Sequence, residues 1–319
     1  MTPPDAQIGA ATPTSPAKLG LVFALAAATL YGITIVFARI AFNGGANPGA
    51  VMELRFLAVA VTMAVVMRWR GRSFAVPRQV RLRLGLVCLG VFAVATGYIY
   101  SILFIPVSLA ALIFYTFPLI VAAVVPALER SWPRPALLAA FPVAFAGLAL
   151  ALGASFSGLD WRGVAFAGLA SVGGAYIFIV APKAVAQYDV FGVTFYVGFS
   201  NVILMGLMIL VYEGVTLPVT GLGWTGLIGV AVFYTIANLS MFAALKAAGA
   251  TTSALVFNLE PLVAILGAVL LLGERLSPAQ MGGVALVIGA LMLATLGRGR
   301  AAASAAAAND SETPGPPGP

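Results

Sequence analysis

Histidine is missing from this chain of 319 residues, cysteine occurs once, and charged residues make up only 8% of it. Without histidine the chain cannot build a His-ligated metal site or a Ser-His-Asp or Cys-His catalytic group. The single cysteine, Cys88, cannot form an internal disulfide. No nucleotide-binding motif is present, so ATP is excluded as a direct energy source. We therefore expect no metal, no cofactor and no catalytic residues.

Apolar residues are abundant instead, at 61% of the chain. This composition is typical of a polytopic membrane protein. Ten apolar runs have roughly the 20-residue length that crosses a bilayer. The sequence therefore predicts an all-α polytopic membrane protein with ten transmembrane helices, over 18–40, 49–68, 83–105, 107–127, 135–153, 161–182, 190–212, 222–246, 250–272 and 278–296.

Basic residues predict the orientation. Of the 17 Lys and Arg residues, about 13 fall on one side if the N-terminus is cytoplasmic, and six of them lie between Arg68 and Arg83. Both termini are therefore expected in the cytoplasm. The net charge of +7 is interpreted as this topology signal and not as nucleic-acid binding, because the arginines cluster at helix ends. Residues 1–17 and 297–319 are predicted to be disordered cytoplasmic tails.

The chain repeats itself at an offset of 143 residues, which predicts a first five-helix repeat over 18–153 and a second over 161–296. An odd number of crossings per repeat makes the second copy run upside down relative to the first. Secondary transporters use such inverted repeats to build a midplane site that either face can reach. The matching residues are Phe23 with Phe166, Phe56 with Phe199, Phe114 with Phe257, and Pro118 with Pro261.

Residues 246–295 carry a family resemblance. They contain Asn258-Leu259-Glu260-Pro261, then Leu-Gly-Glu-Arg-Leu over 272–276, then a Gly-rich last helix. This order, with Glu-Leu-Arg-Phe over 53–56, resembles the EamA-type transporters of the drug/metabolite transporter superfamily, and among them the YddG-like amino-acid exporters. The resemblance implies a bacterial inner-membrane exporter of small metabolites such as aromatic or apolar amino acids. It also implies a cavity lined by helices 1, 3, 4, 6, 8 and 9, and two halves that rock by alternating access.

Glu260 is the sharpest candidate for a site residue, because a carboxylate near the middle of a span is costly in hydrocarbon, by about 3 kcal/mol. It either couples protons or binds a substrate amine, or the Glu-Pro pair is structural. Other polar side chains near mid-membrane either line the cavity or pack between helices. These further substrate-binding candidates are Tyr31, Thr34, Tyr98, Tyr115, Tyr176, Tyr234, Asn238 and Asn258.

Three charged residues, Arg39, Glu53 and Arg55, are expected near the outer ends of helices 1 and 2. They either form an extracellular gate or lie at the headgroup level. Lys183 and Lys246 leave open a phosphate- or nucleotide-sugar-type anion exchanger of the same fold. From other classes, an intramembrane enzyme or a channel would need catalytic groups or a polar lining that the sequence lacks. The expected partners are a small-molecule substrate and the lipid bilayer, with no nucleic acid, for a monomer or weak dimer.

Overall fold

The computed structural model describes residues 16–130, 135–153, 159–212, 214–272 and 275–290, and its architecture is all α. The expected tails lie outside these residues, except that Pro16 and Ala17 already belong to the first helix. The first half contains α1 (Pro16–Asn43), α2 (Pro48–Trp69), α3 (Arg78–Ser101), α4 (Val107–Phe114), α5 (Phe117–Glu129) and α6 (Pro135–Ala151). The second half contains α7 (Trp161–Gln187), α8 (Val190–Tyr212), α9 (Gly221–Ala248), α10 (Ala250–Val256), the 3-10 turn η1 (Phe257–Leu259), α11 (Glu260–Leu272) and a last helix over Pro278–Ala290.

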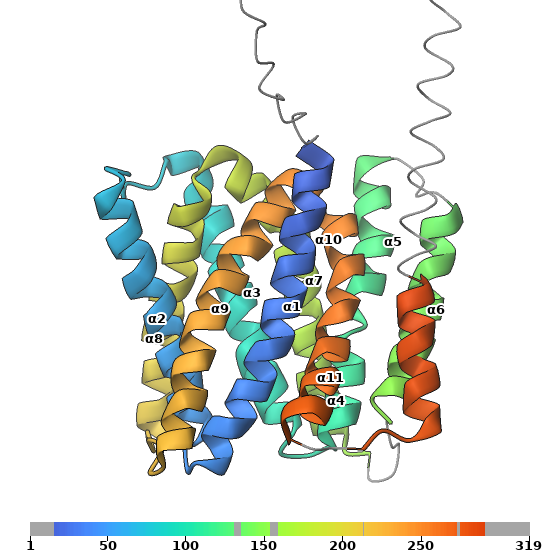
Figure 1. Ribbon diagram of the computed structural model, residues 1–319. Helices are drawn as coiled ribbons and strands as arrows, with labels where there is room; N and C mark the ends of the chain where they lie inside the picture. The colour runs from blue at the N-terminus through green and yellow to red at the C-terminus, as the bar shows by residue number, and fades with distance from the viewer. Residues whose placement is uncertain (1–15, 131–134, 154–158, 213, 273–274, 291–319) are drawn as a thin grey trace, which may run out of the picture.

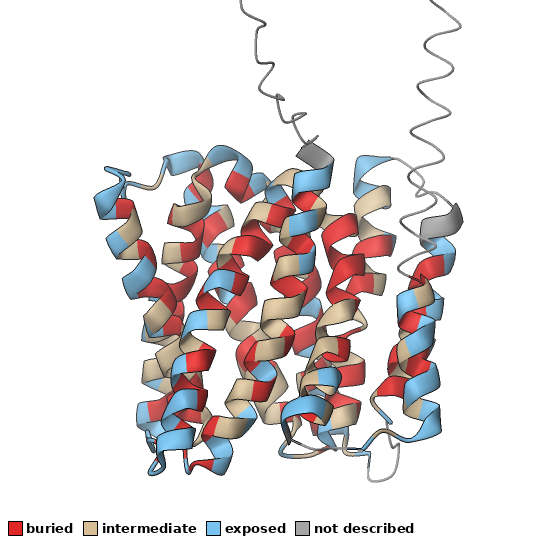
Figure 2. Cartoon of the chain, in the orientation of Figure 1, coloured by how far each residue is buried: buried red, intermediate tan, exposed pale blue. Residues whose placement is uncertain are grey.

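The predicted membrane class is confirmed by the lengths of these helices. Eight stretches in the described residues are long and apolar enough to cross a membrane, and two of these are the pairs α4–α5 and α10–α11. The shorter apolar helices over Leu138–Ala151 and Pro278–Ala290 correspond to the fifth helix of each half. Large apolar side chains such as Trp69 and Leu210 remain more than four-fifths exposed, and Figure 2 shows exposed residues along the outward sides of the helices. These surfaces are suited to lipid.

The two halves run in opposite directions, as predicted. In Figure 1, α1 begins at the upper face and α7 begins at the lower face, so each helix of the first half has an inverted counterpart in the second. α1 begins at the upper face, and the last helix runs from the lower face towards it. We call the upper face the arginine-rich face, because Arg68, Arg70, Arg72 and Arg78 lie at its helix ends. The other is called the opposite face.

The most extensive helix contacts join the two halves: α1 packs along α9, α3 along α7, and α2 along α8. Glycines allow these close approaches. A Cβ added to Gly20 in α1 would lie 2.6 Å from the backbone nitrogen of Ala248, and one added to Gly163 in α7 would lie 2.7 Å from Ile105. Both pairs are related by the offset of 143, since 20 and 105 become 163 and 248. The contacts therefore follow the same pseudo-symmetry as the sequence repeat.

The fourth helix of each half is interrupted at the same repeat position. In the first half α4 ends at Phe114 and α5 begins at Phe117, while in the second half η1 separates α10 from α11. Pro118 and Pro261 occupy the second position of the helices that follow, where a missing backbone N–H is tolerated. Interrupted helices at matching positions in inverted repeats are typical of transporter binding sites.

Candidate functional site

The interruptions of the two fourth helices bring Glu260 and Tyr115 together. Glu260 is the first residue of α11, and Tyr115 follows α4 directly. The Tyr115 hydroxyl donates a hydrogen bond to the Glu260 carboxylate. Because the two residues belong to different halves, this bond joins the repeats where both helices are broken.

Tyrosine and phenylalanine rings surround this pair. Tyr31 of α1 lies 5.5 Å from the Tyr234 ring in an edge-to-face contact and 5.8 Å from Phe257, measured between centroids. Tyr98 of α3 lies 5.9 Å from Phe114. Tyr31 and Tyr98 are both electrostatic neighbours of Glu260. Rings at these separations contribute specific aromatic contacts beyond their buried area.

Arg55 of α2 points inward to the same rings. Its guanidinium carbon lies 4.4 Å from the centroid of the Tyr234 ring and 4.9 Å from that of Phe56, which are cation–π distances. Arg55 also interacts electrostatically with Glu260. Its Nε is buried and has no hydrogen-bond partner among the described residues. We define the central cluster as Tyr31, Arg55, Tyr98, Tyr115, Tyr234 and Glu260.

The remaining predicted binding residues are occupied within their own helices or face elsewhere. Thr34, Asn238 and Asn258 are buried, and each side chain donates to a backbone carbonyl three or four residues earlier. Tyr176 of α7 lies against α3, where a Cβ on Gly90 would be 3.6 Å from its ring. These four residues therefore do not join the central cluster in this structure.

The charged residues expected near the outer ends take different positions. Arg39 is exposed in the last part of α1. Glu53 faces α8, where a Cβ on Gly206 would lie 3.6 Å from its Oε1. Arg55 belongs to the central cluster, and a gating role for the three residues stays a prediction. Lys183 and Lys246 are exposed near the ends of α7 and α9.

Sequence reasoning missed a hydroxyl pair beside the cluster. The side chains of Thr116, at the break of the first half, and Ser171 of α7 are joined by a hydrogen bond of 2.7 Å. Met241 of α9 was missed as well, and it accepts from the Tyr31 hydroxyl at 3.8 Å. Thr116 precedes Phe117-Pro118, and a hydroxyl next to a helix-interrupting proline was the available signal. In the described residues, no three His, Cys, Asp or Glu side chains gather as a metal site would require.

On the arginine-rich face, the loop 70–77 between α2 and α3 is held against the second half. Its contacts are hydrogen bonds from the Tyr188 hydroxyl to Ser73 O (3.2 Å) and from the Tyr196 hydroxyl to Phe74 O (2.7 Å), and the ion pair of Arg72 with Asp189 (3.9 Å). Partial burial raises the pKa of the Tyr188 phenol, so this donor stays protonated at neutral pH. We call these contacts the arginine-face clamp.

The opposite face has a pseudo-symmetric counterpart, the opposite-face clamp, between the segments 44–47 and 214–219. Asn47 and Thr216 bond reciprocally, because Asn47 N donates to Thr216 O and Thr216 N donates to Asn47 Oδ1, both at 3.1 Å. Val219 N donates to Gly44 O at 2.9 Å. Thr216 is the counterpart of Ser73 at the offset of 143. On each face, the loop between the second and third helices of one half contacts the connection between the first and second helices of the other half. On the arginine-rich face the contact extends to Tyr196 of α8.

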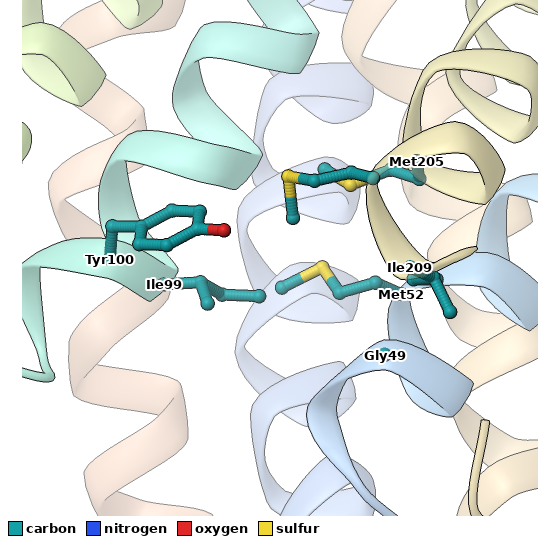
Figure 3. A pocket seen from close by; sticks show the side chains of 7 residues that line it. Gly49, Met52, Ile99, Tyr100, Met205 and Ile209 are labelled. Atoms are coloured by element: carbon teal, nitrogen blue, oxygen red, sulfur yellow. The ribbon is translucent and has the colours of Figure 1, made fainter. Parts of the chain in front are cut away.

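A small hollow lies between α2, α3 and α8 towards the opposite face. Figure 3 shows Met52 and Met205 reaching into it from α2 and α8, with Ile99 and Tyr100 on the α3 side. Its free volume is about 10 Å³, or room for one water molecule. Along α2, Gly49, Met52 and Phe56 share one helix face. The hollow therefore adjoins the central cluster through Phe56, whose ring lies 5.6 Å from that of Tyr234.

Inverted halves, helices broken at matching positions and partly buried charged side chains beside the breaks define a polytopic membrane transporter. The chain matches the model of the EamA-like transporter family over residues 18–153 and again over 161–296. It belongs to this family, which is part of the drug/metabolite transporter superfamily. No curated protein matches it. Among 29 matching chains of solved structures, one entitled simply "Crystal structure of protein" has a TM-score of 0.76. The match covers 87% of this chain and 97% of the other at 18% identity, which shows the fold alone.

Proposed function

We propose that the protein is a secondary transporter that exports small amphipathic metabolites, namely amino acids with aromatic or apolar side chains, across the bacterial inner membrane. The observation that carries this proposal is the central cluster, in which a cation, a carboxylate and aromatic rings from both halves meet beside two broken helices. A zwitterion needs one anchor of each charge, and an apolar side chain needs a ring surface.

Each anchor has a definite role in the proposal. The Arg55 guanidinium, whose Nε has no hydrogen-bond partner in the described part of the chain, binds the substrate carboxylate. Glu260 binds the ammonium group, and the hydrogen bond from Tyr115 orients its carboxylate. The Tyr31 and Tyr234 rings contact the side chain. The exposed positions of Lys183 and Lys246 do not favour an anion-exchanger site at the centre.

Transport proceeds by alternating access around this cluster. Movement of one intact half against the other would separate α1 from α9 and α3 from α7, which are packed along their lengths. We therefore assign the moving bodies to crossed groups, which keep these two pairs intact and leave the α2–α8 contact at the boundary between the groups. One group contains α1, α2, α9, α10 and α11, and its pseudo-symmetric partner contains α3, α4, α5, α7 and α8.

The two clamps act as alternating gates. With the arginine-rich face in the cytoplasm, as the positive-inside rule favours, release of the arginine-face clamp admits substrate, and release of the opposite-face clamp frees it outside. Both clamps are formed here, and aromatic rings are in contact in the central cluster. This arrangement corresponds to an occluded state between the two open ones.

Counterflow in proteoliposomes tests the function. Vesicles loaded with unlabelled phenylalanine should accumulate labelled phenylalanine transiently and saturably, because a carrier exchanges faster than it returns empty. Arg55→Leu should abolish exchange, while Arg55→Lys, which keeps the charge and loses the planar fork, should retain part of it. The absence of counterflow across a panel of amino acids and related metabolites would contradict the proposed transport function.

Glu260 decides between proton coupling and facilitated diffusion. If protons are coupled, an imposed pH step drives uptake against the substrate gradient in wild type but not in Glu260→Gln. If flux is facilitated diffusion, the pH step drives no accumulation and the glutamine variant loses affinity for amines only. If Glu260→Gln leaves the transport rate, the affinity and the pH dependence unchanged, Glu260 neither couples protons nor binds the amine.

A further inference from the structure

One oxygen of the Glu53 carboxylate, next in sequence to Met52 of the hollow, has no hydrogen-bond partner among the described residues. This oxygen, Oε2, is buried. Burying a carboxylate oxygen away from water is costly unless a cation or a hydrogen-bond donor meets it. Gly206 of α8 leaves the space it occupies, since a Cβ there would lie 3.6 Å from Oε1 and 3.9 Å from Oε2.

Methionines form a compliant apolar wall next to this carboxylate. Met52 of α2 and Met205 and Met208 of α8 line the hollow, and the Tyr100 hydroxyl is turned towards them (Figure 3). Methionine side chains have three rotatable bonds and a polarisable sulfur, so they rearrange around ligands of varied shape. A hollow of about 10 Å³ therefore widens by side-chain rotation when an apolar group enters.

The hollow lies between the level of the central cluster and the opposite face. Gly49, Tyr100 and Ile209 are all within a few residues of the helix ends at the opposite face. Towards the membrane middle, Phe56 separates the hollow from Tyr234. In the proposed motion α2 belongs to one moving body and α3 and α8 to the other. The hollow is thus at a boundary that opens when the outward-facing state forms.

We propose that this hollow is an exit site, a second substrate position that binds an amphipathic amine through the Glu53 carboxylate and the methionine wall. The inference rests on the proposed function for its direction of travel. A substrate leaving the central cluster exchanges one ammonium partner, Glu260, for another, Glu53. Its carboxylate leaves Arg55, which is turned to the other side of α2 against Tyr234. The exit site consequently selects for the amine, whereas the central cluster selects for both charges.

Cysteine protection tests the exit site directly, because the chain has a single cysteine to replace. In a Cys88→Ser background, Met52→Cys places one thiol in the hollow. Proteoliposomes that expose the opposite face are treated with a membrane-impermeant thiosulfonate. The probes are phenethylamine, which carries only the amine, and 3-phenylpropionate, which carries only the carboxylate. Val215→Cys, exposed in the segment between α8 and α9 at the opposite face, serves as the matched control.

We expect Met52→Cys to be labelled and phenethylamine to slow the labelling by about tenfold at roughly ten times its half-protecting concentration. Phenylpropionate should give no protection, Glu53→Gln should abolish the protection by phenethylamine, and Val215→Cys should be labelled and unprotected throughout. Met208→Cys repeats the test if Met52→Cys does not fold. A thiol in the hollow that is unlabelled, or labelled but equally unprotected by both probes, overturns the exit site.

Counterflow by the Cys88→Ser vesicles separates this inference from the proposed function. Intact counterflow without protection removes the exit site alone. Protection by phenethylamine without counterflow supports an amine site in the hollow and removes the transport cycle. Protection that survives Glu53→Gln shows that the amine acts from elsewhere, and it also overturns the assignment of Glu53.

Discussion

The close packing of α3 on α7 gives a quantitative prediction, because α3 has one glycine at the contact with α7 and another away from it. A Cβ on Gly97 would lie 2.7 Å from the carbonyl oxygen of Phe166 and 2.9 Å from the backbone nitrogen of Ala170. A Cβ on Gly85 would have no described heavy atom within 4 Å. Both substitutions by alanine gain about 1 kcal/mol of helix propensity. Only Gly97→Ala also forces two backbones apart, which costs about 1–3 kcal/mol.

We therefore expect Gly85→Ala to be as stable as wild type or more stable, and Gly97→Ala to be less stable than Gly85→Ala by about 1–3 kcal/mol. At roughly 2–4 °C per kcal/mol, the apparent Tm in detergent should separate the two variants by several degrees. Gly168→Ala, on α7 and likewise without a described neighbour within 4 Å, is a second control. Equal Tm values for Gly97→Ala and Gly85→Ala would refute the close packing of α3 on α7.

Three further predictions concern the cluster, a clamp and a helix cap. Tyr115→Phe removes the hydrogen bond to Glu260, worth about 1.5–3 kcal/mol for a charged acceptor; counterflow of phenylalanine should fall at least about tenfold, and an unchanged rate would contradict the orienting role. Tyr196→Phe removes a 2.7 Å hydrogen bond from the arginine-face clamp; thiol labelling of the central cluster from that face should rise several-fold, with no rise from the opposite face. Arg162, mainly by side-chain hydrogen bonds, holds the pKa of Asp160 below its usual value; the cap at α7 should stabilise above the usual carboxyl range near pH 4 and weaken as the pH falls through the lowered pKa. Asp160→Ala should lower the Tm at pH 7 and not at strongly acidic pH; an equal loss at both would show that its charge is irrelevant.

The crossings and their inversion were predictable because both depend on chain-wide signals. Apolar run lengths predict spans, and five helices per repeat force opposite directions. Pro118 and Pro261 also indicated that the fourth helices are interrupted. The helix-by-helix pairing was not predictable. It depends on where single glycines such as Gly20 meet the backbone of a partner helix, and position in the sequence does not reveal that partner.

The site was predictable in part for a related reason. Depth in the membrane follows from counting residues along a span, so Glu260, Tyr115 and Tyr234 could be assigned to the middle. The direction of a side chain around its helix depends on tertiary packing. Arg55 therefore lies against Tyr234, although counting alone suggested a position nearer the surface. Asn258 is buried two residues before Glu260, yet its side chain bonds to its own backbone at Leu255.

Two-sided access to the central cluster is the most direct test of the account. Met241, which accepts from the Tyr31 hydroxyl, can be replaced by cysteine in the Cys88→Ser background and treated with an impermeant thiol reagent in vesicles of either orientation. The account predicts that the thiol is labelled from both faces, at a rate no faster than the exchange between the inward-open and outward-open states. Phenylalanine should slow the labelling from both faces. Labelling from one face only, in vesicles that carry out counterflow, would contradict alternating access around this cluster.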